Sequence, residues 1–203
     1  MDAAIVDYGA GNVFSVATAL ERLGARVTVT ADEKKIRDAS RVVFPGVGQA
    51  SAAMEHLKNT GLDALIPRLT QPVLGICLGM QLMCRRTEEG DTAGLGIFPL
   101  SVERFPEGPV KLKVPHMGWN TVEGLRTGLF EGITDGSRMY FVHSYFVPDS
   151  LDTAARTVYG QPFASAVARD NFFGCQFHPE KSSAAGRRVL ENFLAKDPEK
   201  RIG

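Results

Sequence analysis

The stretch PVLGICLGMQLMC, residues 72–84, limits most strongly what this chain can fold into. Its apolar residues 73–76 predict a buried strand, and Leu78, Leu82 and Met83 then offer an apolar face to a helix. Glycines stand at positions 75 and 79, on either side of Cys77. Larger side chains at those two places would clash across a tight strand-to-helix turn. The stretch therefore predicts a nucleophile elbow that carries a cysteine at its tip.

Cys77 has two interpretations on this basis. The first turn of a helix offers free backbone N–H groups and the positive end of the helix dipole, and both favour the thiolate, which is the reactive form of cysteine. The alternative is a buried structural cysteine in an ordinary strand–helix unit. The elbow alone leaves both interpretations open, because short motifs also match by chance.

A second stretch, residues 173–180 (FGCQFHPE), supplies partners for such a nucleophile. Pro179 favours extended backbone at His178, and residues two apart in an extended segment point to the same side. The carboxylate of Glu180 can then orient the imidazole of His178, which gives a general base with its orienting group. The alternative is a pair of surface residues that follow a strand.

The composition is that of an ordinary globular protein. The chain has 203 residues, which suits a single domain over 1–203, with 44% hydrophobic and 23% charged residues. Lys plus Arg and Asp plus Glu each number 23, so the zero net charge does not indicate nucleic acid or a membrane surface as a partner. We expect no membrane-spanning segment and no secretory signal. Three cysteines without a scaffold spacing fit free thiols in the cytoplasm, and no metal or other cofactor is predicted.

The pattern of apolar residues predicts an α/β fold with a mostly parallel sheet flanked by helices. Strands are expected at 3–7, 26–30 and 42–44, and helices at 13–23 and near 52–58. The polar segment 85–94 is expected to form a loop at the rim of the site. From residue 100 the pattern changes to short extended runs that add antiparallel strands, at 101–104, 111–114, 139–147, 154–159, 164–168 and 172–177. A last helix is expected after the candidate N-caps Ser182 and Ser183, with a buried face made by Val189, Leu190, Phe193 and Leu194.

Several single residues and loops carry weaker indications. In PGVG, residues 45–48, two glycines surround one valine, so backbone N–H groups there can approach a ligand and join the N–H of Leu78 as oxyanion donors. A plain turn is the alternative. The turn at 8–12 has three interpretations, namely a tight strand-to-helix turn, a phosphate-binding loop and a surface that contacts a partner. Trp119 is expected in the core, and His143, on an apolar strand, as a core or edge residue. His56 is expected at the surface of a polar helix.

Together these motifs resemble the class I glutamine amidotransferases. GICLGMQ (75–81) and QFHPE (176–180) are similar to the nucleophile and His-x-Glu segments of that family, which implies a flavodoxin-like fold. Further stretches narrow the resemblance to the glutaminase subunits of imidazole glycerol phosphate synthases: DYGAGN (7–12), PGVG (45–48), PHMGWN (115–120), YFVHSY (140–145) and GCQFHPEKS (174–182). Met80 stands where many other amidotransferases carry histidine, and Gln49 and Ala50 differ from the usual continuation of the PGVG loop.

The resemblance implies a reaction and a set of site residues. Cys77 would attack the side-chain amide of L-glutamine, His178 would move protons, and Glu180 would orient His178. Oxyanion and substrate contacts are implied for Gly46, Val47, Gly48, Leu78 and Gln81 near the elbow, and for Glu89, His143, Ser144 and Tyr145 further along the chain.

The resemblance also implies a heterodimer with a (β/α)8-barrel cyclase subunit. That subunit would use the ammonia to make imidazole glycerol phosphate and an aminoimidazole carboxamide ribotide in histidine biosynthesis. We expect it to dock over the mouth of the site and to contact Asn12, Trp119 and Lys181, because the loop after the first strand opens on the sheet edge of Cys77 and Lys181 follows Glu180 directly. The alternative is that Asn12 is a helix cap and Trp119 a core residue. Free ammonia mostly becomes ammonium at neutral pH, which independently favours a separate acceptor chain. Three alternatives remain at this point: a related cysteine hydrolase, a glutaminase subunit of another synthase, and a catalytically inactive binding subunit.

Overall fold

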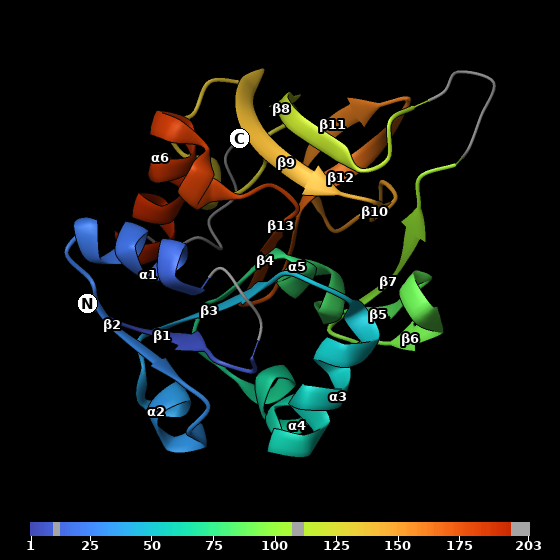
Figure 1. Cartoon of the computed structure of the whole chain (residues 1–203). Coiled ribbons are helices and arrows are strands. Elements are labelled where there is room, and N and C mark those ends of the chain that lie inside the picture. The colour runs from blue at the N-terminus through green and yellow to red at the C-terminus, as the bar shows by residue number, and fades with distance from the viewer. Residues whose placement is uncertain (10–12, 107–111, 196–203) are drawn as a thin grey trace.

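A computed structural model describes residues 1–9, 13–106 and 112–195 of the chain (Figure 1). The strands of its largest sheet are β1 Asp2–Val6, β2 Arg26–Thr30, β3 Arg41–Gly46, β4 Val73–Cys77, β11 Thr153–Tyr159, β12 Gln161–Arg169 and β13 Phe172–Cys175. They lie in the order β11-β12-β13-β4-β3-β1-β2. The neighbours from β13 to β2 are parallel, and β12 and β11 add an antiparallel edge. The parallel part has the strand order of flavodoxin-like folds, which confirms the expected mostly parallel sheet.

Helices lie on both faces of this sheet. They are α1 Val13–Arg22, α2 Glu33–Asp38, α3 Ala50–Thr60, α4 Leu62–Leu65, α5 Leu78–Met83 and α6 Ser183–Ala195, with short 3-10 turns η1 Ile66–Arg68, η2 Glu89–Asp91, η3 Gly128–Phe130 and η4 Pro179–Lys181. Helices α1 and α6 cover one face, whereas α2, α3 and α4 cover the other (Figure 1). The short helix α5 starts where β4 ends, and all of its side chains are buried.

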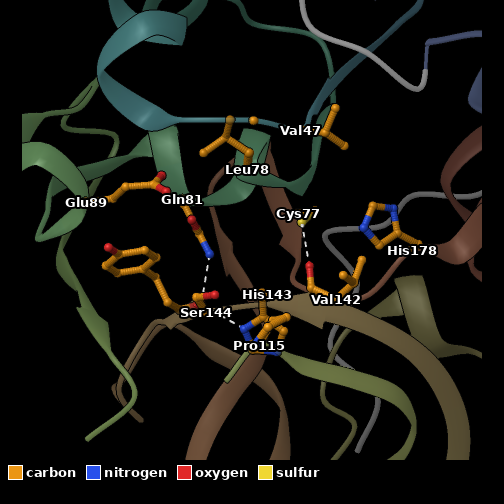
Figure 2. A pocket seen from close by; sticks show the side chains of 12 residues that line it. Val47, Cys77, Leu78, Gln81, Glu89, Pro115, Val142, His143, Ser144 and His178 are labelled. Carbon is orange, nitrogen blue, oxygen red and sulfur yellow. Dashed lines mark hydrogen bonds between the residues drawn. The ribbon is translucent and has the colours of Figure 1, made fainter. Parts of the chain in front are cut away.

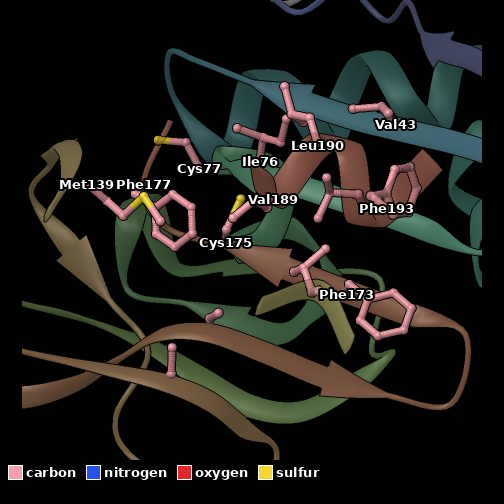
Figure 3. Packing of buried hydrophobic residues seen from close by; sticks show 14 of the residues in the cluster. Val43, Ile76, Cys77, Met139, Phe173, Cys175, Phe177, Val189, Leu190 and Phe193 are labelled. Atoms are coloured by element: carbon pink, nitrogen blue, oxygen red, sulfur yellow. The ribbon is translucent and has the colours of Figure 1, made fainter. Parts of the chain in front are cut away.

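The two faces of the sheet form two layers of core. Successive side chains of a strand point to opposite faces, so Ala3 and Ile5 pack in one layer and Ala4 and Val6 in the other. The first layer contains the apolar face of α6 and the end of β4 (Figure 3). All four predicted core residues of this last helix are buried there, namely Val189, Leu190, Phe193 and Leu194.

Two smaller sheets are attached beside the carboxyl end of β4. One has the order β10-β7-β5-β6, with β5 Cys84–Thr87, β6 Thr92–Ala93, β7 Phe98–Arg104 and β10 Tyr145–Phe146. The other pairs β8 His116–Val122 with β9 Ser137–His143. The extra strands expected in the second half are therefore present, although only part of them joins the large sheet.

Three details of this half differ from the expected pattern. The segment 85–94 is not a plain loop, because it contains most of β5 and all of β6. Its strand β5 buries Cys84 and Thr87 and exposes Arg85 and Arg86, so burial does not alternate along it. The pairing with β7 is irregular between Cys84 and Arg86, and the sequence therefore lacks the period-two pattern of a strand. Residues 112–114 form no strand, and residue 111 lies outside the described residues. Strand β8 was not expected at all.

The parallel arrangement brings three loops together at one edge of the sheet. In register, Gly46 at the end of β3 is opposite Cys77 at the end of β4, and Cys175 at the end of β13 is opposite Ile76. The carboxyl ends of parallel strands are where such sheets form their ligand crevice. No helix within the described ranges is long and apolar enough to span a bilayer.

Candidate active site

The elbow places Cys77 at the junction of β4 and α5 in an uncommon backbone conformation. Its φ of 54° and ψ of −111° lie outside the usual regions for a residue with a side chain. A Cβ atom at Gly79 would overlap the carbonyl oxygen of Phe44, and one at Gly75 would lie 2.8 Å from the backbone nitrogen of Met80. The two glycines are therefore needed for the helix and neighbouring strands to approach the turn closely.

His178 and Glu180 follow β13 at the same edge of the sheet. The backbone N–H of His178 donates to the carbonyl of Tyr140, 2.9 Å away. Its Nδ1 lies 2.9 Å from Glu180 Oε1, and the side chains are only 2% and 0% exposed. Nε2 is buried and has no hydrogen bond from the described residues, so this nitrogen is available to exchange a proton with Cys77 or a ligand.

The surroundings of His178 favour its protonated form. Burial by itself lowers the pKa of this imidazole, but interactions with the Cys77 sulfur and the Glu180 carboxylate outweigh burial and raise the pKa from 6.5 to about 9. An imidazolium next to the sulfur stabilises a thiolate. The arrangement therefore suits a cysteine nucleophile that works as an ion pair with histidine.

Ser182 holds the backbone of His178 in place, a role that the sequence did not indicate. Its hydroxyl donates to the carbonyl of His178 at 2.6 Å and accepts from the N–H of Tyr140 at 2.9 Å. The side chain is fully buried between these groups. The prediction that the Ser182 side chain caps α6 is therefore wrong.

A cavity of about 370 Å³ opens beside Cys77 (Figure 2). It is lined by Val47, Gly48, Cys77, Leu78, Gln81, Glu89, Pro115, Val142, His143, Ser144, Tyr145 and His178. Most residues predicted for catalysis, the oxyanion or the substrate thus lie around one pocket. Among the described residues, no group of three or more His, Cys, Asp or Glu side chains is arranged to hold a metal ion.

Two predicted residues lie next to the pocket and do not line it. Glu180 stands behind His178. Gly46 belongs to β3 and packs closely against the Tyr8 hydroxyl, which donates to the Pro45 carbonyl at 2.9 Å. Burial raises the pKa of Tyr8, so this hydroxyl stays protonated and fixes the chain just before Val47.

The pocket side chains of Gln81 and Glu89 each make a bond inside the protein. Gln81 Nε2 donates to the carbonyl of Tyr145 at 2.9 Å and to Gln176 Oε1 at 2.8 Å. Both of its protons are used, which leaves its carbonyl oxygen to meet a ligand. Glu89 Oε2 accepts from the N–H of Ala50 at 2.9 Å, at the start of α3. Glu89 therefore ties the segment after Gly48 to the rim of the pocket.

His143 is buried, as expected for a core residue, and also lines the pocket. It is 6% exposed, and its Nδ1 lies 2.7 Å from the carbonyl oxygen of Tyr145. Burial and the neighbouring histidines lower the pKa of His143 from 6.5 to about 3, with the Tyr145 carbonyl opposing them. The side chain is therefore neutral at physiological pH, and it fixes the turn from β9 to β10 that carries Ser144.

The three residues predicted at a partner interface differ in where the structure places them. Trp119 is 44% exposed on β8, so the expectation of a core position is wrong. It lies on the outer side of a sheet of only two strands, with its ring edge-on to Tyr140 at 6.1 Å. Lys181 is exposed on η4, next to Glu180. Asn12, and with it most of the turn at 8–12, lies outside the described residues. His56 is exposed on α3, as predicted.

Four residues at the site were missed by reasoning from the sequence: Pro115, Val142, Gln176 and Ser182. Pro115 and Val142 contribute through their places beside β8 and β9, which only the fold reveals. Gln176 carried a usable signal, since an amide two residues before His178 at the end of a buried strand needs partners inside the protein.

The fold and this pocket together define a class of protein. The family model for glutamine amidotransferase class-I matches residues 4–196, so the chain belongs to that family, as its motifs predicted. Two solved structures have the same fold at low sequence identity. A protein from Thermoplasma acidophilum, described as part of a putative GMP synthase, has a TM-score of 0.72 at 19% identity, covering 95% of this chain and 92% of that one. A structure described as a glutamine amidotransferase has a TM-score of 0.73 at 18% identity, covering 94% and 96%.

Closer relatives share one description. The protein from Bacteroides fragilis described as imidazole glycerol phosphate synthase subunit HisH is 54% identical over 194 residues, which cover 96% of this chain and 99% of the relative. The protein of the same description from Bacteroides thetaiotaomicron is also 54% identical, with the same coverage. That from Colwellia psychrerythraea is 46% identical and covers 95% of this chain and 92% of the relative.

Proposed function

We propose that this chain is the glutaminase subunit of an imidazole glycerol phosphate synthase. It hydrolyses glutamine to glutamate and ammonia and delivers the ammonia to a cyclase subunit. Membership of the class I glutamine amidotransferases and nearly full-length similarity to proteins described as subunit HisH support this function. The observation that carries it is the single pocket in which Cys77, at the tip of its elbow, meets His178 backed by Glu180.

The reaction follows from these groups. The Cys77 thiolate attacks the side-chain amide carbon of glutamine, and the electron pair of the carbonyl moves to its oxygen. His178 gives its proton to the amide nitrogen, the carbon–nitrogen bond breaks, and ammonia leaves a thioester behind. Water then adds to the thioester carbon while His178 takes its proton. The carbon–sulfur bond breaks, glutamate departs and the thiolate is restored. Glu180 keeps the imidazole oriented throughout.

Backbone and side-chain groups around the pocket stabilise the negative charge of the oxyanion and bind the substrate. The N–H of Leu78, at the first position of α5, and the Val47-Gly48 segment are the proposed oxyanion donors. The carbonyl oxygen of Gln81 accepts a hydrogen bond from an N–H group of the substrate. Glu89 and the segment from His143 to Tyr145 complete the proposed substrate contacts.

The proposed partner is a (β/α)8-barrel cyclase subunit that forms a heterodimer with this chain. It covers the mouth of the pocket, so ammonia passes to it without protonation in bulk water. Trp119, Lys181 and Asn12 are the proposed contacts, and the exposure of the first two supports this assignment. The three cysteines are free, which fits the reducing cytoplasm where we expect the complex to work.

The test measures glutamate release by the chain alone and in the presence of the barrel subunit. We expect release to increase with the partner, and Cys77→Ala to abolish it while the complex still makes product from added ammonium salts. Cys84→Ser is the matched control, because this thiol is buried and does not line the pocket. Glutamate release by Cys77→Ala at the wild-type rate would overturn the mechanism. If the barrel subunit does not increase glutamate release, this chain serves another synthase.

A further inference from the structure

Gln176 is a fully buried side chain that points its amide nitrogen at the nucleophile. Its exposed fraction is 0%, and its Nε2 lies 3.7 Å from Cys77 Sγ, within the range of an N–H···S hydrogen bond. The orientation of this amide is fixed by its other end. Because Gln81 Nε2 can only donate, the Gln176 atom 2.8 Å away must be the oxygen, and the nitrogen must face the sulfur.

The amide of Gln176 is held in this position by a connected set of bonds. Its backbone N–H donates to the carbonyl of Ser165 at 2.9 Å. Gln81, which donates to its oxygen, is itself anchored on the carbonyl of Tyr145, and the same carbonyl accepts from His143 Nδ1 at 2.7 Å. A donor positioned by buried, mutually satisfied partners does not have to be reorganised when charge develops next to it.

The two polar neighbours of the sulfur favour opposite protonation states. The carbonyl oxygen of Val142 lies 3.8 Å from Sγ and can only accept, so it favours the S–H form. The N–H of Gln176 can only donate, so it favours the thiolate. Since Cys77 is 7% exposed and Gln176 is fully buried, a hydrogen bond to the charged form is worth more here than in water.

We propose that Gln176 is a catalytic residue, whose side-chain N–H stabilises the thiolate of Cys77 together with the His178 imidazolium. This rests on the proposed function only in taking Cys77 as the nucleophile. The bond acts whenever the sulfur carries charge. In the breakdown of the thioester, water adds to the carbon, the carbon–sulfur bond breaks, and its electron pair goes to the sulfur that Gln176 faces.

The titratable groups around the sulfur allow a clean measurement. Burial and the charge of Cys77 raise the pKa of Tyr8, and burial with the charges of Glu180 and Cys77 raises the pKa of Cys175. Burial also raises the pKa of Cys84 to about 12. These three groups therefore stay neutral while the pair of Cys77 and His178 titrates. Alkylation by iodoacetamide then reports on Cys77, since Cys84 and Cys175 are protonated and do not line the pocket.

The experiment measures the alkylation rate against pH for the whole chain carrying Gln176→Met, which keeps the length of the side chain and removes the donor. We expect the pH of half-maximal rate to rise by about one unit, which is a tenfold change in the ionisation equilibrium of the thiol. The plateau rate at high pH stays at the wild-type value, because all of Cys77 is then ionised. A purely structural role would change the plateau or the melting temperature and leave the midpoint in place.

Two further variants make the result decisive. Gln71→Met is the matched control, since Gln71 Nε2 donates to the Ile36 carbonyl at 2.9 Å before the start of β4, and we expect wild-type behaviour. Gln176→Glu keeps the volume and an acceptor for Gln81 but puts a carboxylate beside the sulfur, so its midpoint rises further. A folded Gln176→Met or Gln176→Glu protein with the wild-type midpoint overturns the proposal. Alkylation requires no glutamine, so failure of the proposed function would appear separately, as absent glutamate release by the wild-type protein.

Discussion

His116 Nδ1 and His143 Nε2 lie 2.9 Å apart, in a buried pair that joins strands β8 and β9. Because His143 Nδ1 faces the carbonyl oxygen of Tyr145, that nitrogen carries a proton, and Nε2 accepts from His116. The remaining nitrogen of His116 lies 3.3 Å from the amide nitrogen of Asn120, which donates to it. Each ring thus has one proton, and the hydrogen bonds select the neutral form of both.

This pair makes the native state sensitive to acid. Burial lowers the pKa of His116 from 6.5 to about 4, and the pKa of His143 to about 3. Below pH 6.5 the two histidines bind protons in the unfolded chain but stay neutral in the native state. The contribution of this pair to the free energy of unfolding is therefore present above pH 6.5 and is lost as the pH falls. Between pH 7.5 and 5 we expect each ring to cost about 2 kcal/mol of unfolding free energy.

Urea unfolding of wild type and His116→Asn at pH 7.5, 6 and 5 tests this acid sensitivity. The Asn amide can donate from the position of Nδ1 but does not titrate, so the variant should lose about 2 kcal/mol less between pH 7.5 and 5. His56→Gln on the exposed face of α3 is the control and should follow wild type. An equal pH dependence in wild type and His116→Asn would contradict the neutral pair.

The raised pKa of His178, which the Cys77 sulfur and the Glu180 carboxylate support, predicts an alkaline limit to activity. The native pKa of His178 is raised to about 9, so the imidazolium stabilises the native state below pH 6.5 and this contribution is lost as the pH rises through about 9. We expect kcat/KM for glutamine to fall near pH 9 as the proton donor is lost. In Glu180→Gln the pH at which kcat/KM falls should move toward 6.5, because no carboxylate stabilises the imidazolium of His178.

Glu180→Gln should also retain more activity than Cys77→Ala or His178→Ala at neutral pH. An orienting group is less costly to lose than the nucleophile or the base, although the residues act as a unit. Steady-state rates of the three variants in the complex, measured from pH 6 to 10, decide both points. A loss at Glu180 as large as that at Cys77, or an alkaline limb that does not move, would show that the carboxylate has another role.

Ser182→Ala should weaken both the fold and the catalytic base. It leaves the N–H of Tyr140 without its acceptor and removes one of the two hydrogen bonds to the carbonyl of His178, which still accepts from the N–H of Lys181. We therefore expect a cost of about 1–3 kcal/mol. That corresponds to a melting temperature lower by several degrees for a chain of this size. The control is Ser183→Ala, at the next position along the chain, where the side chain is exposed. Equal melting temperatures for the two variants would contradict the role of Ser182.

The sequence predicted the elbow because local rules govern it. The glycines at 75 and 79, the apolar run and the Pro179 turn each act within a few residues, so Cys77, His178 and Glu180 could be named without a fold. The family and the parallel sheet followed from the same signals. Their meeting in one pocket depends on the pairing of β4 with β13, which joins segments about a hundred residues apart.

Other parts could not be predicted, because their cause is tertiary. The two-stranded sheet of β8 and β9 packs one face on the main core, and Trp119 is exposed because it lies on the other face. No local pattern in the sequence revealed β8. The partner of His143 is His116, opposite it across this small sheet. Ser182 carries an ordinary polar side chain, and only the atoms around it distinguish it from a surface residue. The position of Gln176 after a buried strand indicated partners inside the protein, but its contact with Cys77 depends on the fold.

The exposed face beside the pocket gives the last prediction, which concerns the partner. Trp119 is 44% exposed and contacts Tyr140 edge-on, so its removal costs the core little. If it anchors the barrel subunit, Trp119→Ala should keep the melting temperature of the free chain and weaken partner binding at least tenfold, as buried aromatic anchors do when truncated.

The measurement compares Trp119→Ala, Lys181→Ala and Asn12→Ala, each melted alone and then titrated with the barrel subunit while glutamate release is followed. Lys181→Ala should slow association mainly at low salt, because an exposed charge steers encounter more than it holds the complex. Leu151→Ala is the control, since Leu151 is fully exposed and borders a different cavity from that of Cys77. Unchanged binding and unchanged stimulation in all three variants would remove this face as the interface. A lower melting temperature for Trp119→Ala would show that the indole ring stabilises the folded chain.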